Sequence, residues 1–284
     1  MRMSLGGFQE KLCVIAPNAT LSKGKAILKD IALSEDGTPT THILKPQPNR
    51  FPGMIRAEAW GMAAASYATQ TAQTALLAET SATTPIPETL VVKRFDRTLQ
   101  AGKTLRIHQE DCCQALGLDN LQKYASESNS TKSDPTLLGI ARLLVSHAEN
   151  PLAELERLFA QMVTNVALGN TDAHAKNYAF LHKGNTITLS PMYDVVPALE
   201  ITPGVLTMGM RINGKIRIDR IGGCELLSEG KSWGIPAKRC RILLTDVLER
   251  LHEGIQAANA LYPKAAERHS APAFKRINRL ASSM

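Results

Sequence analysis

The stretch Asn170-Thr-Asp-Ala-His-Ala-Lys-Asn177 decides the fold class, because it has the side chains and the spacing of a phosphoryl-transfer loop. Asp172 and Asn177 lie five residues apart within it. In kinase-type enzymes a loop aspartate orients the attacking hydroxyl group, and an asparagine five residues later binds Mg²⁺. Asp172 is therefore a candidate catalytic residue and Asn177 a candidate metal ligand. The alternative is a helix end followed by a turn, for which Asn and Asp are equally suited.

The segments around this loop favour the first interpretation. Residues 152–168 carry apolar side chains at three- and four-residue spacing, which predicts a helix that ends at the loop. Residues 178–181 and 186–189 predict a hairpin directly after the loop. Asp194 follows this hairpin in Ser190-Pro-Met-Tyr-Asp-Val and takes the place of the aspartate that opens a kinase metal loop. Two carboxylates and one amide suit Mg²⁺, which prefers oxygen ligands.

The first hundred residues contain the groups that such a loop needs for phosphate binding. The runs 11–16, 41–45 and 89–95 are β-prone, and the Ala-rich residues 56–67 between the last two favour a helix, in the order strand, strand, helix, strand. Lys45 ends a strand and suits a phosphate contact, with Glu58 as its ion-pair partner. A solvated strand-end lysine is the alternative for Lys45. Ser4-Leu-Gly-Gly-Phe-Gln-Glu-Lys11 is a glycine-containing loop whose backbone amides suit phosphates.

Composition and patterning restrict the class further. The 284 residues carry a net charge of +7, which favours an anionic partner, although solubility alone also accounts for it. No run reaches the roughly 18 apolar residues of a membrane span, so we expect a cytoplasmic protein without membrane contact. The five cysteines form no CxxC pair and are expected to be reduced thiols. From about residue 108 the pattern is helical, with a helix capped at Asp134-Pro135, an Asn213-Gly214 hairpin and a final helix at 237–262.

Six strings together resemble one family, the HipA-type serine/threonine kinases that serve as toxins of bacterial toxin–antitoxin systems. They are SLGGFQEK (4–11), THILKP (41–46), VKRFDR (92–97), HQEDCCQALGL (108–118), NTDAHAKN (170–177) and SPMYDV (190–195). The resemblance implies a two-lobed, protein-kinase-like α+β fold. Residues 1–97 would form a small strand-rich N-lobe, and residues 98–284 a mostly helical C-lobe.

The resemblance also implies ATP and Mg²⁺ as cofactors and assigns roles residue by residue. Asp172 would be the catalytic base, Asn177 and Asp194 the metal ligands, and Ser4 the site of autophosphorylation. Glu58 would pair with the phosphate lysine. The ATP-binding residues would be Gly6, Gly7, Phe8, Gln9, Glu10, Lys11, Lys45, the hinge residues Lys93, Arg94 and Phe95, and His174, Lys176, Asn177, Tyr193 and Asp194.

The implied partners follow from the same family. They are a protein substrate such as an aminoacyl-tRNA synthetase, a helix-turn-helix antitoxin, and operator DNA reached through that antitoxin. Longer members carry an extra N-terminal subdomain before the glycine loop, whereas this sequence begins three residues before Ser4. We therefore expect either a truncated start or a separate small protein that completes the N-lobe, as in the split members of the family.

Two other functions remain open from the residues. One is a nucleotide-binding pseudokinase that acts as a corepressor subunit, which the intact set Asp172, Asn177 and Asp194 disfavours. The other is a small-molecule phosphotransferase of the aminoglycoside-kinase type, which shares the Asp-to-Asn spacing. The strings HQEDCCQ and SLGGFQEK are not typical of that class.

Overall fold

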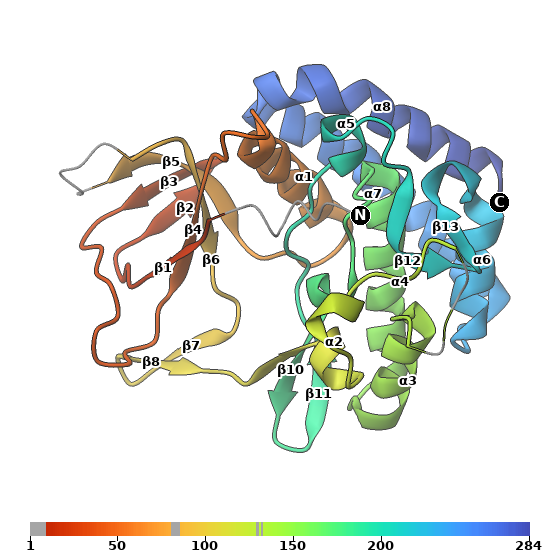
Figure 1. The fold of residues 1–284 in the computed structure, drawn as a ribbon, viewed down its shortest axis with the longest axis horizontal. Helices are drawn as coiled ribbons and strands as arrows, with labels where there is room; N and C mark the ends of the chain where they lie inside the picture. Colours follow the sequence, from red (N-terminus) through yellow and green to blue (C-terminus); the bar gives the residue numbers. More distant parts are fainter. Residues whose placement is uncertain (1–9, 81–85, 129–130, 132) are drawn as a thin grey trace.

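The computed structural model describes residues 10–80, 86–128, 131 and 133–284. A strand-rich part lies beside a mostly helical part, with helix α1 (Met54–Ala68) between them (Figure 1). The strand-rich part contains a six-stranded sheet in the order β1-β4-β6-β5-β3-β2. Its pairs are antiparallel apart from β3 and β5. The strands are β1 (Leu12–Val14), β2 (Thr20–Ser22), β3 (Lys25–Leu28), β4 (His42–Pro46), β5 (Thr74–Thr80) and β6 (Thr89–Lys93).

The two faces of the sheet are covered differently. Val14, Leu28 and Val91 pack into a small apolar cluster on one face. Leu90 and Val92, which alternate with Val91 along β6, join the main core with residues of α1. Because successive side chains of a strand point to opposite faces, β6 is buried on both sides, which explains its continuous apolar run.

Helix α1 packs closely against α7 (Ala237–Leu261), and its small side chains permit this approach. A Cβ atom on Gly254 of α7 would lie 2.3 Å from the backbone oxygen of Ala64, so the two helices approach backbone to backbone at this point. Trp60 is fully buried beside this contact, and its indole N–H donates to Asn259 Oδ1 at 2.9 Å. Burial of so large a ring contributes on the order of 2–3 kcal/mol. The strand-rich part is thereby fixed to the helices through α1.

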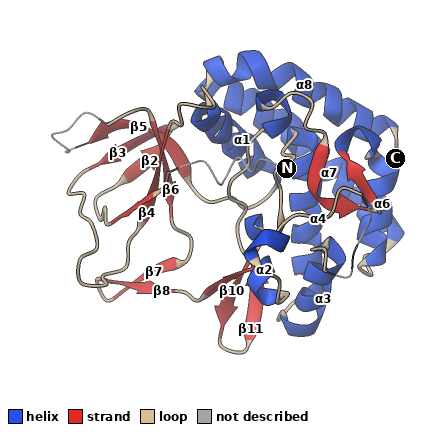
Figure 2. Ribbon diagram, viewed as in Figure 1, coloured by secondary structure: helices blue, strands red, loops and turns tan. Residues whose placement is uncertain are grey.

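Most of the remaining elements form the helical part, while the hairpin of β7 (Arg97–Gln100) and β8 (Lys103–Arg106) lies on the side of the strand-rich part (Figure 2). Helix α4 (Pro151–Leu168) runs through its core, where Leu158, Phe159 and Val163 are fully buried. The other helices are α2 (Cys112–Ala115), α3 (Leu137–His147), α5 (Ala198–Ile201), α6 (Gly223–Ser232) and α8 (Pro263–Ser282), with 3₁₀ turns η2 (Asn120–Gln122), η3 (Ala175–Asn177) and η4 (Ile218–Arg220). The other strands are β9 (Gln109–Asp111), β10 (Ala179–Lys183), β11 (Thr186–Leu189), β12 (Thr207–Ile212) and β13 (Lys215–Arg217).

Several sequence predictions about elements are confirmed. A strand overlaps each of the three β-prone runs, and α1 and α4 lie where helices were expected. The hairpin β10–β11 follows residues 170–177, as expected. The turn between β12 and β13 has Asn213 at φ 47° and Gly214 at φ 75°, as a type I′ turn requires.

Three predictions about elements are wrong. The order of the first elements also includes β2, β3 and β5, which the simple strand, strand, helix, strand order omitted. Helix α3 is capped by Thr136, whose hydroxyl accepts from Gly139 N at 3.0 Å, because the Asp134 carboxylate instead accepts from Ser126 N at 3.1 Å. The helix at 237–262 was expected to be the last one, but a further helix, α8, begins at Pro263, directly after α7 ends. Across the described ranges, no helix is long and apolar enough to cross a membrane.

Candidate active site

A cavity of about 320 Å³ opens beside the sheet and is lined by residues from both parts of the molecule. Eleven of the residues that the sequence singled out line it: Lys11, Lys45, Glu58, Lys93, Arg94, Phe95, His174, Lys176, Asn177, Tyr193 and Asp194. The cavity combines an apolar side with a group of charged side chains. A site of this size and mixed chemistry suits a nucleotide-sized ligand.

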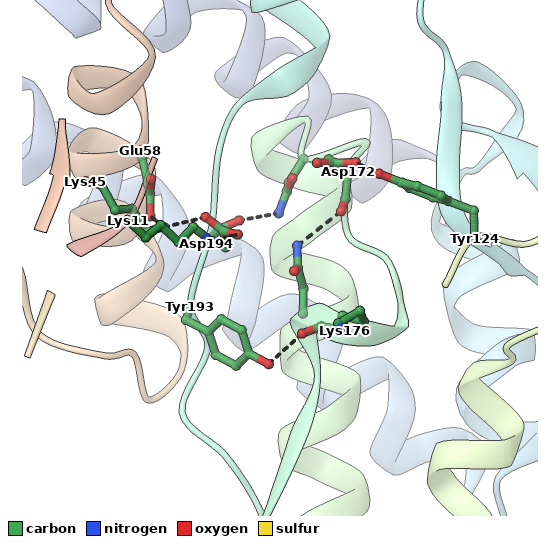
Figure 3. Close-up of polar contacts among 10 residues, drawn as sticks. Lys11, Lys45, Glu58, Tyr124, Asp172, Lys176, Tyr193 and Asp194 are labelled. Carbon is green, nitrogen blue, oxygen red and sulfur yellow. Dashed lines mark hydrogen bonds and ion pairs between the residues drawn. The ribbon is translucent and has the colours of Figure 1, made fainter. Parts of the chain in front are cut away.

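Lys45 connects two carboxylates at one end of the cavity (Figure 3). Its Nζ atom lies 2.5 Å from Glu58 Oε1 and 2.6 Å from Asp194 Oδ1. Lys11 is farther away, with its Nζ atom 3.9 Å from Asp194 Oδ2. Lys45 is 5% exposed and Glu58 is fully buried, so water screens these charges little. This end of the cavity can exchange ion pairs with phosphate oxygens.

The charges of this cluster depend on one another. Burial alone would lower the pKa of Lys45, but the attraction of Asp194 and then Glu58 raises it well above its usual range. Burial opposes ionisation of Asp194, yet the neighbouring Lys45 and then Lys11 hold its pKa well below the usual value. Burial raises the pKa of Glu58, partly offset by Lys45. We conclude that Lys45 and Asp194 are both ionised at neutral pH.

Asp194 is held in place by its backbone as well as its charge. It has φ 60°, in the left-handed region that non-glycine residues rarely adopt. Asn170 Nδ2 donates to the backbone oxygen of Asp194 at 3.3 Å. The neighbouring Tyr193 donates its hydroxyl to the backbone oxygen of Lys176 at 2.7 Å (Figure 3). These two bonds join the Asp194 segment to the loop that carries Asp172.

The Asp172 loop begins where α4 ends at Gly169, which has φ 74°. Asn177 Nδ2 donates to the backbone oxygen of Asp172 at 3.1 Å, which closes the loop on itself. Tyr124, from the segment before α3, donates its hydroxyl to Asp172 Oδ1 (Figure 3). Asp172 itself does not line the cavity but lies directly behind Asn177, which does.

His174 and Lys176 of the same loop have different environments. His174 is 5% exposed, and burial, followed by the charge of Lys123, lowers its pKa to about 3, so the imidazole is neutral at pH 7. Its ring meets the Tyr124 ring edge-on, with centroids 5.0 Å apart. Lys176 is more exposed and donates to Asn120 Oδ1 at 2.8 Å. His174 is therefore a buried, neutral side chain in the cavity lining, whereas Lys176 lines the cavity as a more exposed side chain.

The end of β6 and the residues directly after it also line the cavity. Lys93 N donates to Gln73 O and Arg94 N donates to Thr41 O, both at 2.9 Å. Their backbone N–H groups are thus used within the fold, which leaves other backbone groups of this segment to receive a ligand. The Phe95 ring lies 5.5 Å from the Tyr193 ring, centroid to centroid, and forms an aromatic wall.

Some predicted residues do not join the cavity, and others were missed. Glu10 is exposed and absent from the lining, and Ser4, Gly6, Gly7, Phe8 and Gln9 lie outside the described residues. The missed lining residues are Ile43, Met62, Thr74, Val92, Asp96, Gln109 and Lys123. Met62 follows Glu58 by four positions on α1, so helical spacing would have found it. Gln109 lies within the string HQEDCCQ and enters because β9 pairs with β10.

The oxygen atoms at this site suit a hard divalent cation. Asp194 contributes a carboxylate that is ionised, and Asn177 lines the same cavity. Since Asn177 uses its amide nitrogen to donate to Asp172 O, its amide oxygen is the atom that a cation would meet. These are the ligand types that Mg²⁺ prefers. The residues present therefore fit a bound Mg²⁺ ion.

Comparison with known proteins places these features in one family. A family model described as the HipA-like C-terminal domain matches residues 3–255. Y4mE of Sinorhizobium fredii, named as a candidate kinase, is 31% identical over the whole chain, which covers 62% of that protein. The serine/threonine-protein kinase toxin HipA of Shewanella oneidensis is 27% identical over 63% of the chain and 43% of its own length. The chain thus spans about half of the curated relatives it matches.

A solved structure matches the fold. HipA in the Shewanella oneidensis complex with HipB and operator DNA superposes with a TM-score of 0.81. The two are 22% identical, and the match covers 99% of this chain and 65% of that one. The expected fold class is thereby confirmed: a strand-rich sheet and a mostly helical region arranged as in HipA.

Proposed function

The chain belongs to the family of the HipA-like C-terminal domain, and on this premise we propose that it is an ATP-dependent serine/threonine protein kinase of a toxin–antitoxin system. The observation that carries the proposal is the cavity in which Lys45, Glu58 and Asp194 meet next to the Asp172 loop. Relatives of the chain are named as kinases, one of them as a serine/threonine-protein kinase toxin.

The proposed lobes follow the ranges expected from the sequence. Residues 1–97 form the N-lobe and residues 98–284 the C-lobe. The support is that both ranges contribute residues to the cavity lining. Lys45 and Glu58 come from the first range, and Asn177 and Asp194 come from the second. ATP binds between the lobes with its adenine against the hinge residues 93–95. Because Lys93 N and Arg94 N already have backbone acceptors, adenine is received by neighbouring backbone groups and packs against Phe95.

Phosphoryl transfer then follows from the charges of the site. Lys45 binds phosphate oxygens, and Glu58 keeps its ammonium group in place. Asn177 and Asp194 would hold Mg²⁺, and the bound ion would neutralise charge on the phosphates. The hydroxyl oxygen of the substrate forms a bond to the γ-phosphorus as the bond from that phosphorus to the β–γ bridging oxygen breaks. ADP leaves with the electron pair of that bond, and Asp172 accepts the proton of the hydroxyl group.

The partners are proposed from the relatives. HipA of Shewanella oneidensis was solved with HipB and operator DNA, and we propose a helix-turn-helix antitoxin and operator DNA for this chain as well. The proposed substrate class is an aminoacyl-tRNA synthetase, with Ser4 as the autophosphorylation site. A separate small protein that completes the N-lobe is also proposed. Its support is that β1 lies at the edge of the sheet in the described residues, where a further strand can pair.

Quantitative phosphoproteomics of cells that express the wild type or Asp172→Asn tests the function. Growth arrest and new phosphoserine or phosphothreonine sites are expected with the wild type and are expected to disappear with Asp172→Asn. If cells with either protein showed the same set of phosphorylation sites, the proposed kinase function would be refuted. Binding of ATP without any Asp172-dependent site would support the pseudokinase instead.

A further inference from the structure

The segment Lys123-Tyr124 lies against the Asp172 loop although it precedes that loop by 48 residues in the sequence. Three contacts join the two. Ala175 N donates to the backbone oxygen of Lys123 at 3.1 Å. Tyr124 donates its hydroxyl to Asp172 Oδ1 (Figure 3). The Tyr124 ring meets the His174 ring edge-on, with centroids 5.0 Å apart. A backbone bond, a side-chain bond and a ring contact together fix this segment on the loop.

The two side chains of the segment face different features of the site. Lys123 lines the cavity together with Lys45, Asn177 and Asp194. Its ammonium group lies 5.2 Å from the centre of the Tyr124 ring. Burial lowers the pKa of Lys123, and the nearby Asp172 carboxylate opposes that shift. The ammonium group of Lys123 therefore lies near both the cavity and Asp172. In the proposed reaction, the transferred phosphoryl group has to pass through this region.

Three other lysines that line the cavity have partners away from Asp172. Lys45 is paired with Glu58 and Asp194, and Lys11 lies 3.9 Å from Asp194. Lys176 lies 3.5 Å from Asp111 and donates to Asn120. These contacts direct the charges of Lys11 and Lys45 toward Asp194, and that of Lys176 toward Asp111 and Asn120. The charge of Lys123, in contrast, interacts with the Asp172 carboxylate.

We propose that Lys123 is a catalytic residue that binds the γ-phosphoryl group during transfer, and that Tyr124 is a positioning residue that orients the Asp172 carboxylate. This inference rests on the proposed kinase function. Tyr124 donates to Oδ1 of Asp172 and thereby orients the carboxylate that receives the proton of the substrate hydroxyl group. Lys123 neutralises charge on the γ-phosphate oxygens while the bond to the β–γ bridging oxygen breaks and ADP leaves. Lys123 gives up no proton in this step.

Nucleotide binding by the full chain tests the role of Lys123 without any need for phosphate transfer. Dissociation constants are measured by calorimetry for Mg–ATP and for AMP, with wild type, Lys123→Met, Lys123→Arg and the exposed-site control Lys29→Met. Loss of a charge-assisted phosphate contact is expected to weaken ATP binding by at least roughly tenfold in Lys123→Met. AMP binding is expected to stay unchanged, and Lys123→Arg is expected to recover most of the ATP affinity. Equal weakening for both nucleotides, or none, would overturn the assignment.

Rates of transfer test the role of Tyr124. Labelled phosphate is followed from [γ-³²P]ATP to total cell protein, at several ATP concentrations, for wild type, Tyr124→Phe and the exposed-site control Tyr67→Phe. Tyr124→Phe keeps the ring on His174 but removes the donor to Asp172. The maximal rate is expected to fall by about tenfold or more, while the ATP concentration at half-maximal rate stays the same. An unchanged or higher maximal rate would overturn the positioning role.

The two levels of the account fail in different ways. Transfer that needs Asp172 but is insensitive to Tyr124→Phe, together with ATP binding that is insensitive to Lys123→Met, rejects this inference and leaves the proposed kinase standing. A wild-type protein that neither binds ATP nor transfers phosphate rejects both.

Discussion

The ammonium nitrogen of Lys45 lies 2.6 Å from Oδ1 of Asp194, although the two residues are 149 positions apart in the sequence. Lys45 belongs to strand β4 of the six-stranded sheet, and Asp194 follows the β10–β11 hairpin of the helical part. With Glu58 on its other side, one cation is shared by two carboxylates. The contact therefore connects the two parts of the molecule at the place where phosphate and metal are proposed to bind.

Lys45→Met is expected to destabilise the fold as well as to abolish ATP binding. It leaves the carboxylates of Glu58 and Asp194 buried without their shared cation, at a cost of about 3 kcal/mol or more near pH 8. Since burial already raises the pKa of Glu58, protonation of that carboxyl relieves part of the cost at lower pH. Urea unfolding of Lys45→Met, wild type and the exposed-site control Lys29→Met at about pH 8 and about pH 5.5 checks this. An equal loss at both pH values would contradict the charge argument.

Gly169→Ala is expected to loosen the start of the Asp172 loop. Gly169 has φ 74°, and a Cβ atom there would lie 2.7 Å from Nη2 of Arg276. Arg276 is buried and cannot move away easily, because it donates to Ala167 O at 3.0 Å and to Glu200 Oε1 at 2.5 Å.

Gly184 in the β10–β11 turn is the matched control, since it has φ 59° but no neighbouring atom within 4 Å. Both substitutions carry the backbone strain of about 1–2 kcal/mol, and Gly169→Ala adds the collision. Gly169→Ala is therefore expected to lower the free energy of unfolding by about 2 kcal/mol more than Gly184→Ala. It is also expected to slow phosphate transfer, whereas Gly184→Ala is not. Similar unfolding free energies for both variants would refute the contact with Arg276.

Acidification is expected to destabilise the protein partly through His42 in β4. Burial, and then the charge of Lys93, lowers the pKa of this imidazole from 6.5 to about 4. Between these values the unfolded chain binds a proton that the folded chain does not, so the free energy of unfolding falls as the pH falls from about 6.5 to about 4.

The size of this effect can be measured with a variant. At about pH 5 the His42 contribution corresponds to about 2 kcal/mol. The drop in unfolding free energy between about pH 7.5 and about pH 5 is expected to be smaller by this amount in His42→Asn. The exposed His252→Asn is expected to behave as wild type. A drop of full size in His42→Asn would show that other groups cause the pH dependence.

The sequence allowed prediction of the features that depend on local patterns. Helix α4 follows from its periodicity, and the turn at Asn213-Gly214 from its residue types. The pairing of Lys45 with Glu58 was expected from the order of motifs along the chain, whereas the contact of Lys45 with Asp194 was not. Contacts without a local signature were not predictable. Tyr124 reaches Asp172 across 48 residues, and no spacing rule connects them.

The remaining errors concern elements that the local sequence does not determine by itself. Asp134 and Thr136 can both cap a helix, and the structure uses Thr136 because the Asp134 carboxylate bonds to Ser126 and Thr131 instead. Strand β2 has three residues, none of them buried, so it lacks the alternating pattern that identifies a strand. In both cases tertiary contacts decide what the local sequence leaves open.

The most direct test of the central claim is the transfer of labelled phosphate from [γ-³²P]ATP to cell protein by purified full-length chain, for wild type and Asp172→Asn side by side. The account predicts Mg²⁺-dependent labelling by the wild type. It predicts a loss of at least about a hundredfold in Asp172→Asn, with the ATP dissociation constant and the unfolding free energy little changed. Labelling by a folded, ATP-binding Asp172→Asn protein at the wild-type rate would contradict the account.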